Sequence, residues 1–496
     1  MTSHSDNQWS IQVEIHEEST QILFTTEAFS VICPLLPATR PWFQDVIQGV
    51  RSCVSWSSPA TSQERKPFTI PLRNVLWAEL GDDAYVTIAV LAETGKNHEL
   101  THYNGKVISD LAQAKQWVSR LIELAYDGVP PRRNVKVLVN PKGGQGRAKK
   151  IYEKIVRPML ESARCVIDTQ YTTHRFHAME IAETISLDCD AIVALSGDGL
   201  PHEILNGLAS RPDAIKALRI PVVPVPSGSA NGFSLNLHGL KAGFDVALAV
   251  LNVIKGKPMR LDLCSVTQGG RRTWSYFSQS FGFMADIDLG TEFLRWMGDT
   301  RFYLGFLYGL ISNKPYPFKL FIKSAISDKK DLLALTREPP SKELFKENLV
   351  ESLPADRYIS ESTSDTGWVS FDKPILYVYA GLQPYVARDL LQFPMAKPSD
   401  GYVDIAIQEV ASRAALLSMV DEAGRGGQFY QDTSHYYKAL AYRLEPYPNS
   451  KGVFSVDGEV YPWEPIYIEA HQGLATTLSM HGHFVVTFVD KPSSFV

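Results

Sequence analysis

Three glycine-rich loops in series constrain this 496-residue chain more than any other feature of its sequence. They are Asn140–Gly146 (NPKGGQG), Ser196–Gly199 (SGDG) and Ser227–Gly232 (SGSANG), and each follows a short apolar run with the pattern of a buried strand. Glycines let a backbone turn sharply and bring its N–H groups close to an anion. In a parallel sheet, the loops at the carboxyl ends of the strands share one edge. The series therefore predicts a nucleotide-phosphate site on an α/β sheet.

The pattern of strands and helices predicts three domains. Residues 1–128 hold short β-like runs closed by one amphipathic helix, an order that resembles a pleckstrin-homology-type domain; a β-rich extension packed on the catalytic domains is the alternative. Residues 132–258 alternate strands and helices, which predicts a parallel sheet covered on both faces. Residues 259–496 are strand-rich and predict a β-sandwich, with a flexible insert near 326–367.

Composition and charge exclude several classes of protein. The chain has 49 basic and 54 acidic residues, a net charge of −5 and 45% hydrophobic residues, which is an ordinary globular mixture. We expect no nucleic-acid partner, because bulk charge would not hold one. Five scattered cysteines without a CxxC pair indicate reduced, intracellular thiols. No apolar run approaches the ~20 residues of a membrane span, and the first residues lack a signal-peptide pattern.

The second loop carries the candidate chemistry. Asp198 lies between two glycines and directly before a predicted helix, so its carboxylate is exposed for a function or belongs to a tight turn. In the first loop, Lys142 can add positive charge near a bound anion. Neither loop is the dinucleotide fingerprint or the P-loop. Each of the three loops alone is compatible with an ordinary strand–helix turn. Only the three loops together are specific for a nucleotide-phosphate site.

Taken together, NPKGGQG, SGDGLPHEILNGL and PSGSANG resemble the diacylglycerol kinase catalytic superfamily of lipid kinases, from about Asn134 to the C-terminus. The segment Ser278–Phe302, with its Asp286-Ile287-Asp288 pair of aspartates, resembles sphingoid-base kinases in particular. The resemblance implies a nucleotide domain followed by a lipid-binding β-sandwich, with ATP and Mg²⁺ as cofactors. It implies transfer of the γ-phosphate to the primary hydroxyl of a sphingoid base by a cytoplasmic, peripherally membrane-associated enzyme.

The same resemblance assigns roles to individual residues. Asp198 would be the general base toward the hydroxyl. Asp288 would pair with the protonated amine of the base, because a buried ammonium needs a partner charge. Ser278 and the loop residues Ser196, Gly197 and Gly199 are also expected at the substrate. The residues expected at the nucleotide are Asn140, Pro141, Lys142, Gly143, Gly144, Arg175, Glu203, Gly228, Ser229, Ala230, Arg295, Arg301, Asp457, Gly458 and Glu459. No side chain is assigned to the metal.

Three alternatives stay open at this point. A ceramide or diacylglycerol kinase would share the loops, but its neutral lipid would not need Asp288. A catalytically silent lipid-binding scaffold would not need Asp198. An enzyme resembling NAD kinases would share the GDG motif without a lipid pocket. For the lipid itself, the apolar run from Phe302 to Leu310 is a candidate lining of an alkyl tunnel.

Overall fold

The computed structural model describes residues 8–15, 18–32, 68–95, 97–143, 146–290, 314–337, 352–365 and 367–488. The chain divides into two compact units. Unit 1 comprises residues 1–134, 151–167 and 245–256, and unit 2 comprises residues 135–150, 168–244 and 257–496. The three domain boundaries expected from the sequence stay predictions.

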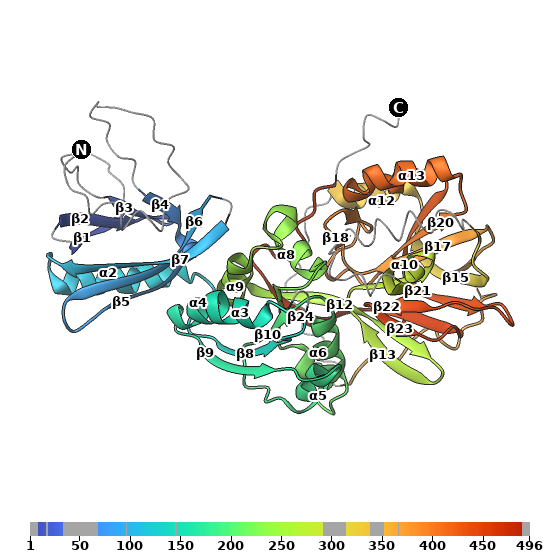
Figure 1. The fold of residues 1–496 in the computed structure, drawn as a ribbon, viewed down its shortest axis with the longest axis horizontal. Helices are drawn as coiled ribbons and strands as arrows, with labels where there is room; N and C mark the ends of the chain where they lie inside the picture. The colour runs from blue at the N-terminus through green and yellow to red at the C-terminus, as the bar shows by residue number, and fades with distance from the viewer. Residues whose placement is uncertain are drawn as a thin grey trace. The chain divides into compact units, whose positions relative to one another are not determined.

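Unit 1 is built on an antiparallel seven-stranded sheet with the order β4-β3-β2-β1-β7-β6-β5 (Figure 1). The helix α2 (Leu111–Ala125) follows the strands, and the Asp110 carboxylate caps it by accepting from two backbone amides of its first turn. Trp117 of α2 meets Phe24 edge-on at 5.1 Å, so the apolar stripe of the helix packs on the sheet. The strands are β1 (Trp9–Ile15), β2 (Glu18–Phe24), β3 (Ala28–Ile32), β4 (Phe68–Pro71), β5 (Val75–Leu80), β6 (Tyr85–Thr94) and β7 (Asn97–Val107).

Next along the chain is a four-stranded parallel sheet of the order β11-β10-β8-β9. The central strand β10 pairs in parallel with β8 on one side and β11 on the other. Alternating helices connect the strands, which confirms the predicted α/β architecture. The elements are β8 (Asn134–Val139), β9 (Val166–Tyr171), α5 (His177–Thr184), β10 (Ala191–Ser196), α6 (Gly199–Ala209), α7 (Ala214–Leu218), β11 (Val222–Pro226), α8 (Gly232–Ala242) and α9 (Val246–Lys255).

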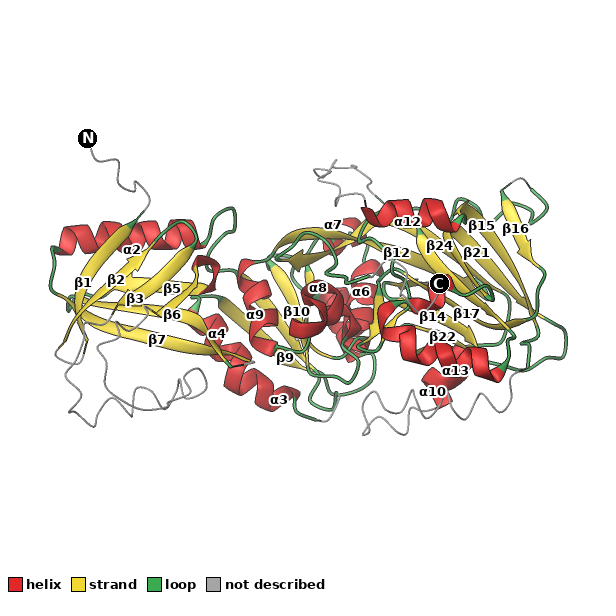
Figure 2. Cartoon of the chain, turned by 90° about the horizontal axis from the view of Figure 1, so that it is seen from above, coloured by secondary structure: helices red, strands yellow, loops and turns green. Residues whose placement is uncertain are grey.

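An 11-stranded antiparallel sheet follows, as Figure 2 shows in yellow. Side chains from distant strands, such as Phe281, Ile322, Ile405 and Ile468, share one buried cluster, so the sheet folds over its own core. This confirms a parallel-sheet domain followed by a β-domain. The strands are β12 (Lys257–Gln268), β13 (Arg271–Ser275), β14 (Ser278–Gly282), β15 (Phe318–Ile326), β16 (Trp368–Phe371), β17 (Ile375–Gly381), β20 (Val403–Glu409), β21 (Ser434–Pro446), β22 (Phe454–Val456), β23 (Glu459–Tyr461) and β24 (Ile466–Ser479).

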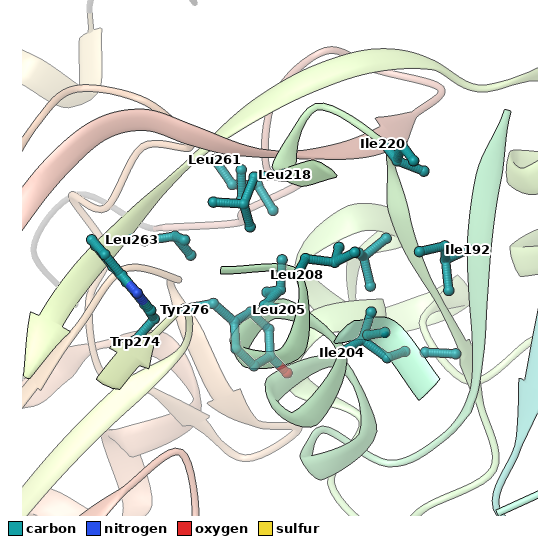
Figure 3. Close-up of a cluster of buried hydrophobic side chains, with 14 of the residues drawn as sticks. Ile192, Ile204, Leu205, Leu208, Leu218, Ile220, Leu261, Leu263, Trp274 and Tyr276 are labelled. Carbon is teal, nitrogen blue, oxygen red and sulfur yellow. The ribbon is translucent and has the colours of Figure 1, made fainter. Parts of the chain in front are cut away.

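Helix α6 lies in a hydrophobic cluster that it shares with the antiparallel sheet. Leu205 and Leu208 of α6 belong to the same buried cluster as Ile192 of β10 and as Leu261 and Trp274 of the β-domain (Figure 3). Burial of a large aliphatic side chain contributes about 1.5–3 kcal/mol, so this cluster fixes α6 firmly between the two sheets. The helix directly follows the second glycine loop, and its anchoring therefore positions Asp198.

Part of the segment 326–367 is ordered, where the sequence predicts a flexible insert. Residues Lys329–Arg337 form the helix α12, and Leu332 on it is 0% exposed. Further along, the Asp356 carboxylate accepts from the Ser265 hydroxyl at 2.7 Å and pairs with Arg272 at 2.6 Å. The Asp356 carboxylate, one of the charged groups on which the prediction of a flexible insert rested, is thus bonded to other parts of the folded protein.

None of the described helices is by itself long and apolar enough to span a membrane. Only α8 and α9 taken together, as a bent pair, reach the required length and composition.

Candidate active site

The three glycine loops meet one another at the carboxyl ends of β8, β10 and β11. A Cβ atom on Gly143 would lie 2.6 Å from the Ser196 hydroxyl, so the first loop touches the second. A Cβ on Gly228 would lie 2.4 Å from the Cα of Gly197, so the second loop touches the third. Glycine is required at Gly228 because backbone meets backbone there, and at Gly143 because the side chains of Ser196 and Asn140 leave no room for a Cβ. The structure therefore brings the three predicted loops into one site.

Asp198 is held by the helix that follows the third loop. Its two carboxylate oxygens accept from the backbone N–H groups of Gly232 and Phe233, each at 3.0 Å, at the start of α8. The N-terminal end of a helix carries a partial positive charge and favours an anion. On the other side, the Tyr276 hydroxyl donates to the backbone carbonyl of Asp198 at 2.8 Å. Both the main chain and the carboxylate of Asp198 are thus fixed.

Burial raises the pKa of the Asp198 carboxyl above its ordinary value, and the N–H donors of Phe233 and Gly232 oppose that rise. The group is therefore a better proton acceptor than an exposed aspartate, because a higher pKa means a higher proton affinity. A raised carboxyl pKa next to glycine loops is a typical feature of a catalytic site.

Asp198 lines a cavity of about 670 Å³, and the other lining residues fall by their chemistry into two sets, which we call the polar end and the apolar end. Its polar end is lined by the three loops and by polar side chains of residues 172–175. Its apolar end is lined by Phe277, Met284, Ile287, Tyr377, Tyr379, Val386, Ala387, Leu390 and Met419. A cavity with polar and apolar lining residues suits one polar and one apolar substrate, whose reactive groups would meet within it.

Two carboxylates face the polar end together with one arginine. Arg175 forms an ion pair with Glu459, and its guanidinium stacks on the Phe176 ring at 4.8 Å. Glu203 of α6 accepts from the backbone N–H of Ala178 at 3.1 Å. Burial raises the pKa of Glu203, and the backbone N–H groups that donate to its carboxylate oppose the rise. The predicted residues Arg175, Glu203 and Glu459 thus all reach the cavity.

Asp457 and Gly458 form the turn between β22 and β23. Both have positive φ, +50° and +82°, and Val456 pairs with Glu459 across the two-residue loop. This is the geometry of a tight hairpin, for which Asp-Gly is a preferred sequence. The Asp457 carboxylate points into the protein, where it is bonded to backbone amides of residues 276–278 and to the His202 ring.

Most of the predicted site residues line the cavity: Asn140, Lys142, Gly143, Arg175, Ser196, Gly197, Asp198, Gly199, Glu203, Gly228, Ser229, Ala230, Ser278, Asp457, Gly458 and Glu459. Pro141 belongs to the first loop but is not among the lining residues. Gly144, Arg295 and Arg301 lie outside the described residues, as does the run from Phe302 to Leu310. Asp288 belongs to the helix α10 (Phe283–Gly290), but its side chain is outside the described part of the chain.

The apolar lining was not predicted from the sequence. Tyr377 and Tyr379 project from β17, Leu390 comes from the short strand β19 (Leu390–Leu391), and Met419 comes from the helix α13 (Arg413–Glu422). These residues are far apart in the sequence and look like ordinary core positions. The period-2 spacing of the two tyrosines is the only local signal that they share a face.

Asp286, two residues before Asp288, is already engaged within the protein. Its carboxylate accepts a hydrogen bond from the Tyr316 hydroxyl, and burial raises its pKa although that bond opposes the rise. Asp286 therefore has a defined partner within the protein.

Comparisons with known proteins agree with this geometry. A family model described as the diacylglycerol kinase catalytic domain matches residues 134–266, and one described as a domain of unknown function matches residues 45–127. The chain is 33% identical over 440 residues to sphingoid long chain base kinase 4 of Schizosaccharomyces pombe, which covers 86% of this chain and 93% of that protein.

Two further comparisons extend this result. Sphingosine kinase 1 of Homo sapiens is 31% identical over 360 residues, 69% of this chain and 90% of that protein. The crystal structure of a diacylglycerol kinase from Bacillus anthracis aligns with a TM-score of 0.45 at 18% identity, over 70% of this chain and 97% of that one.

Proposed function

The chain belongs to the sphingoid long-chain base kinases, and from this premise we propose how its cavity divides the two substrates between its ends. The protein is a lipid kinase that acts on sphingoid bases and uses ATP. ATP occupies the polar end, with its phosphates against the backbone of the three loops. The sphingoid base lies with its alkyl chain in the apolar end and its primary hydroxyl at Asp198. The observation that carries this proposal is that Asp198 lines one cavity together with the polar glycine loops and the apolar residues of the β-domain.

The polar end fits a nucleotide triphosphate. Gly143 and Gly228 let the three loops pack closely together, and glycine-rich loops at strand ends bind phosphate through their backbone N–H groups. Lys142 supplies positive charge at the rim, and Gly458 and Glu459 face the nucleotide from the β22–β23 hairpin. We assign Asp457 a different role, because its carboxylate is engaged inside the protein.

The residues of this end also suit Mg²⁺ carried on ATP. Among the described residues there is no group of three His, Cys, Asp or Glu side chains that could hold a metal by themselves. Mg²⁺ in kinases is held by substrate phosphates together with one or two carboxylates, and Glu203 and Glu459 are carboxylates that line this end. When bound, the ion would neutralise charge on the phosphates.

Asp198 acts as the general base. Its carboxylate takes the proton of the primary hydroxyl, the hydroxyl oxygen forms a bond to the γ-phosphorus, and the bond to the β-phosphate oxygen breaks so that ADP leaves. The raised pKa favours the proton transfer, and the amides of Gly232 and Phe233 hold the carboxylate in place throughout.

Asp288 is the proposed partner of the protonated amine of the base. Asp286 in the same helix serves as a matched comparison, because its carboxylate is bonded to Tyr316. Replacing Asp288 by Asn should raise the KM for the base and leave the KM for ATP unchanged. A rise in both constants would contradict this role.

A lipid panel tests the proposal. Purified protein is incubated with radiolabelled ATP and Mg²⁺ and with sphinganine, sphingosine, phytosphingosine, ceramide or diacylglycerol in mixed micelles, with Asp198→Asn as the inactive control. We expect label in the three bases and little in the two neutral lipids. Preferential labelling of ceramide or diacylglycerol would contradict the substrate assignment. Because the substrate is a lipid, we further propose peripheral contact with a membrane, which flotation with vesicles containing sphinganine would test.

A further inference from the structure

Asp457 is the most densely bonded carboxylate near the cavity that phosphoryl transfer does not use. Its residue is 8% exposed, and its side-chain oxygens accept from the Ser275 hydroxyl at 2.8 Å and from three successive backbone amides, Tyr276, Phe277 and Ser278, at 2.9–3.1 Å. A fifth donor is the ring of His202, whose Nδ1 lies 2.8 Å from the carboxylate. A carboxylate with this many donors is fixed in position.

The five donors come from two different parts of the fold. Four belong to the connection between β13 and β14, which leads into Ser278 at the lipid side of the cavity. The fifth, His202, belongs to α6, the helix that directly follows Asp198. The turn at Asp457 therefore bonds both to the start of β14 and to α6, the helix that begins directly after Asp198.

We propose that His202 is a positioning residue, which through Asp457 holds the start of β14 in register with Asp198 during phosphoryl transfer. This inference rests on the proposed function of the same cavity. The lipid side includes Phe277 and Ser278, and Phe277 also packs on Gly232, where a Cβ would lie 2.3 Å from its ring. Gly232 in turn donates to Asp198. One buried carboxylate thus controls both the lipid wall and the donors that hold the base.

His202 provides this link, but the fold does not depend on His202 alone. Without it, Asp457 keeps the four donors of residues 275–278. Asn206, one turn further along α6, still donates to the Trp274 carbonyl and accepts from the Trp274 amide, each at 2.9 Å. The Tyr276 hydroxyl still bonds to the main chain of Asp198. Loss of the His202 bond should therefore relax the alignment of the two parts while the protein stays folded.

Small misalignments matter for this chemistry. A displacement of 1 Å caused far from the reacting atoms can lower the rate by about 10²-fold, because the reacting groups must be held in a near-attack geometry. Neither substrate needs to touch His202 to be bound. A positioning role for His202 thus predicts that its replacement lowers kcat with little change in the KM of either substrate.

The test compares His202→Leu, which fills the volume without a donor, with His202→Asn, whose amide nitrogen lies near the position of Nδ1 and can donate to Asp457. We expect His202→Leu to lower kcat for sphinganine by ~10- to 100-fold with both KM values within about threefold of wild type. His202→Asn should recover most of the lost kcat. Thermal unfolding of all three proteins reports whether each is folded.

Three outcomes would overturn the inference: wild-type kcat in folded His202→Leu, equal losses in the two variants, or a loss confined to one KM. If His202→Leu does not fold, the comparison of His202→Asn with wild type decides, because the positioning role requires that variant to keep most of the kcat. Wild-type protein in the same assay separates the two proposals, since no label in any base would contradict the proposed function itself.

Discussion

The two ends of the cavity are built in different ways. The polar end is built around three loops of adjacent residues, which pack closely because Gly143, Gly197 and Gly228 lack a Cβ. The apolar end is made of side chains, such as Tyr379 and Met419, from elements that are scattered along the β-domain. A site that needs close backbone contact requires glycine and so leaves a motif in the sequence. A site that needs only an apolar surface accepts many types of residue and therefore leaves no motif in the sequence.

The largest expected effect concerns the residue between the two ends. Asp198→Asn removes the proton acceptor and places an amide against the N–H donors of Gly232 and Phe233. We expect kcat to fall by about 10²–10⁴-fold, which is the usual contribution of general base catalysis. Steady-state kinetics with sphinganine measures the loss. The exposed Asp188→Asn is the matched control, and an Asp198→Asn variant with unchanged kcat would contradict the assignment.

The next effect should be confined to the polar end. Gly228→Ala introduces a Cβ 2.4 Å from the Cα of Gly197, so the loops must separate and the phosphate-binding backbone shifts. We expect the KM for ATP to rise by at least about tenfold, which corresponds to ~1.4 kcal/mol, with the KM for sphinganine unchanged. Gly424→Ala is a suitable control, because the nearest atom to its Cβ would be at an ordinary 3.4 Å. An equal rise in both constants would show that the ends are not independent.

A smaller effect should be confined to the apolar end. Met419 lines the cavity and is 6% exposed, whereas Leu417 on the same helix is 44% exposed. Met419→Ala removes contact with the alkyl chain, and we expect a rise of up to about tenfold in the KM for sphinganine, since alanine loses only part of the ~1.5–3 kcal/mol that burial of the whole side chain contributes. The KM for ATP should not change, and Leu417→Ala should leave both constants unchanged. A thermal unfolding scan separates lost binding from lost stability.

The smallest effect is a displacement of the pH profile. Burial raises the pKa of Asp198, and the carboxylate must be ionised to accept a proton. Activity should therefore be present at high pH and be lost as the pH falls through this raised pKa. The acid limb of kcat/KM for sphinganine should then have its midpoint above the ~3.9 of an ordinary aspartate. A midpoint at or below that value would mean that another group is the base.

The same contrast explains how much the sequence could predict. The three loops, Asp198 and the α/β order could be predicted from local patterns, because a few adjacent residues determine a turn or the end of a strand. The walls of the apolar end did not, because Tyr377 and Met419 come together only through the packing of distant strands and helices. Strand β7 has no apolar run that would predict it, because many of its residues are polar and exposed.

Asp457 shows a different limit of sequence reasoning. Its place in an Asp-Gly-Glu motif predicts contact with the nucleotide, and it lines the cavity, but the motif did not predict that its carboxylate bonds to His202 and to the start of β14. No local pattern records that contact, since the two residues are 255 positions apart. The charged segment around Asp356 is similar, because its partners Ser265 and Arg272 come from strands of the β-domain.

The central claim is that one cavity holds both substrates at once, with Asp198 between them. Isothermal titration of the Asp198→Asn variant with a non-hydrolysable ATP analogue, in the absence and presence of sphinganine, tests it most directly. The account predicts that the analogue binds in both cases with affinities within about threefold, so that a ternary complex forms without turnover. Mutual exclusion of the two ligands, or loss of binding of either one in this variant, would contradict it.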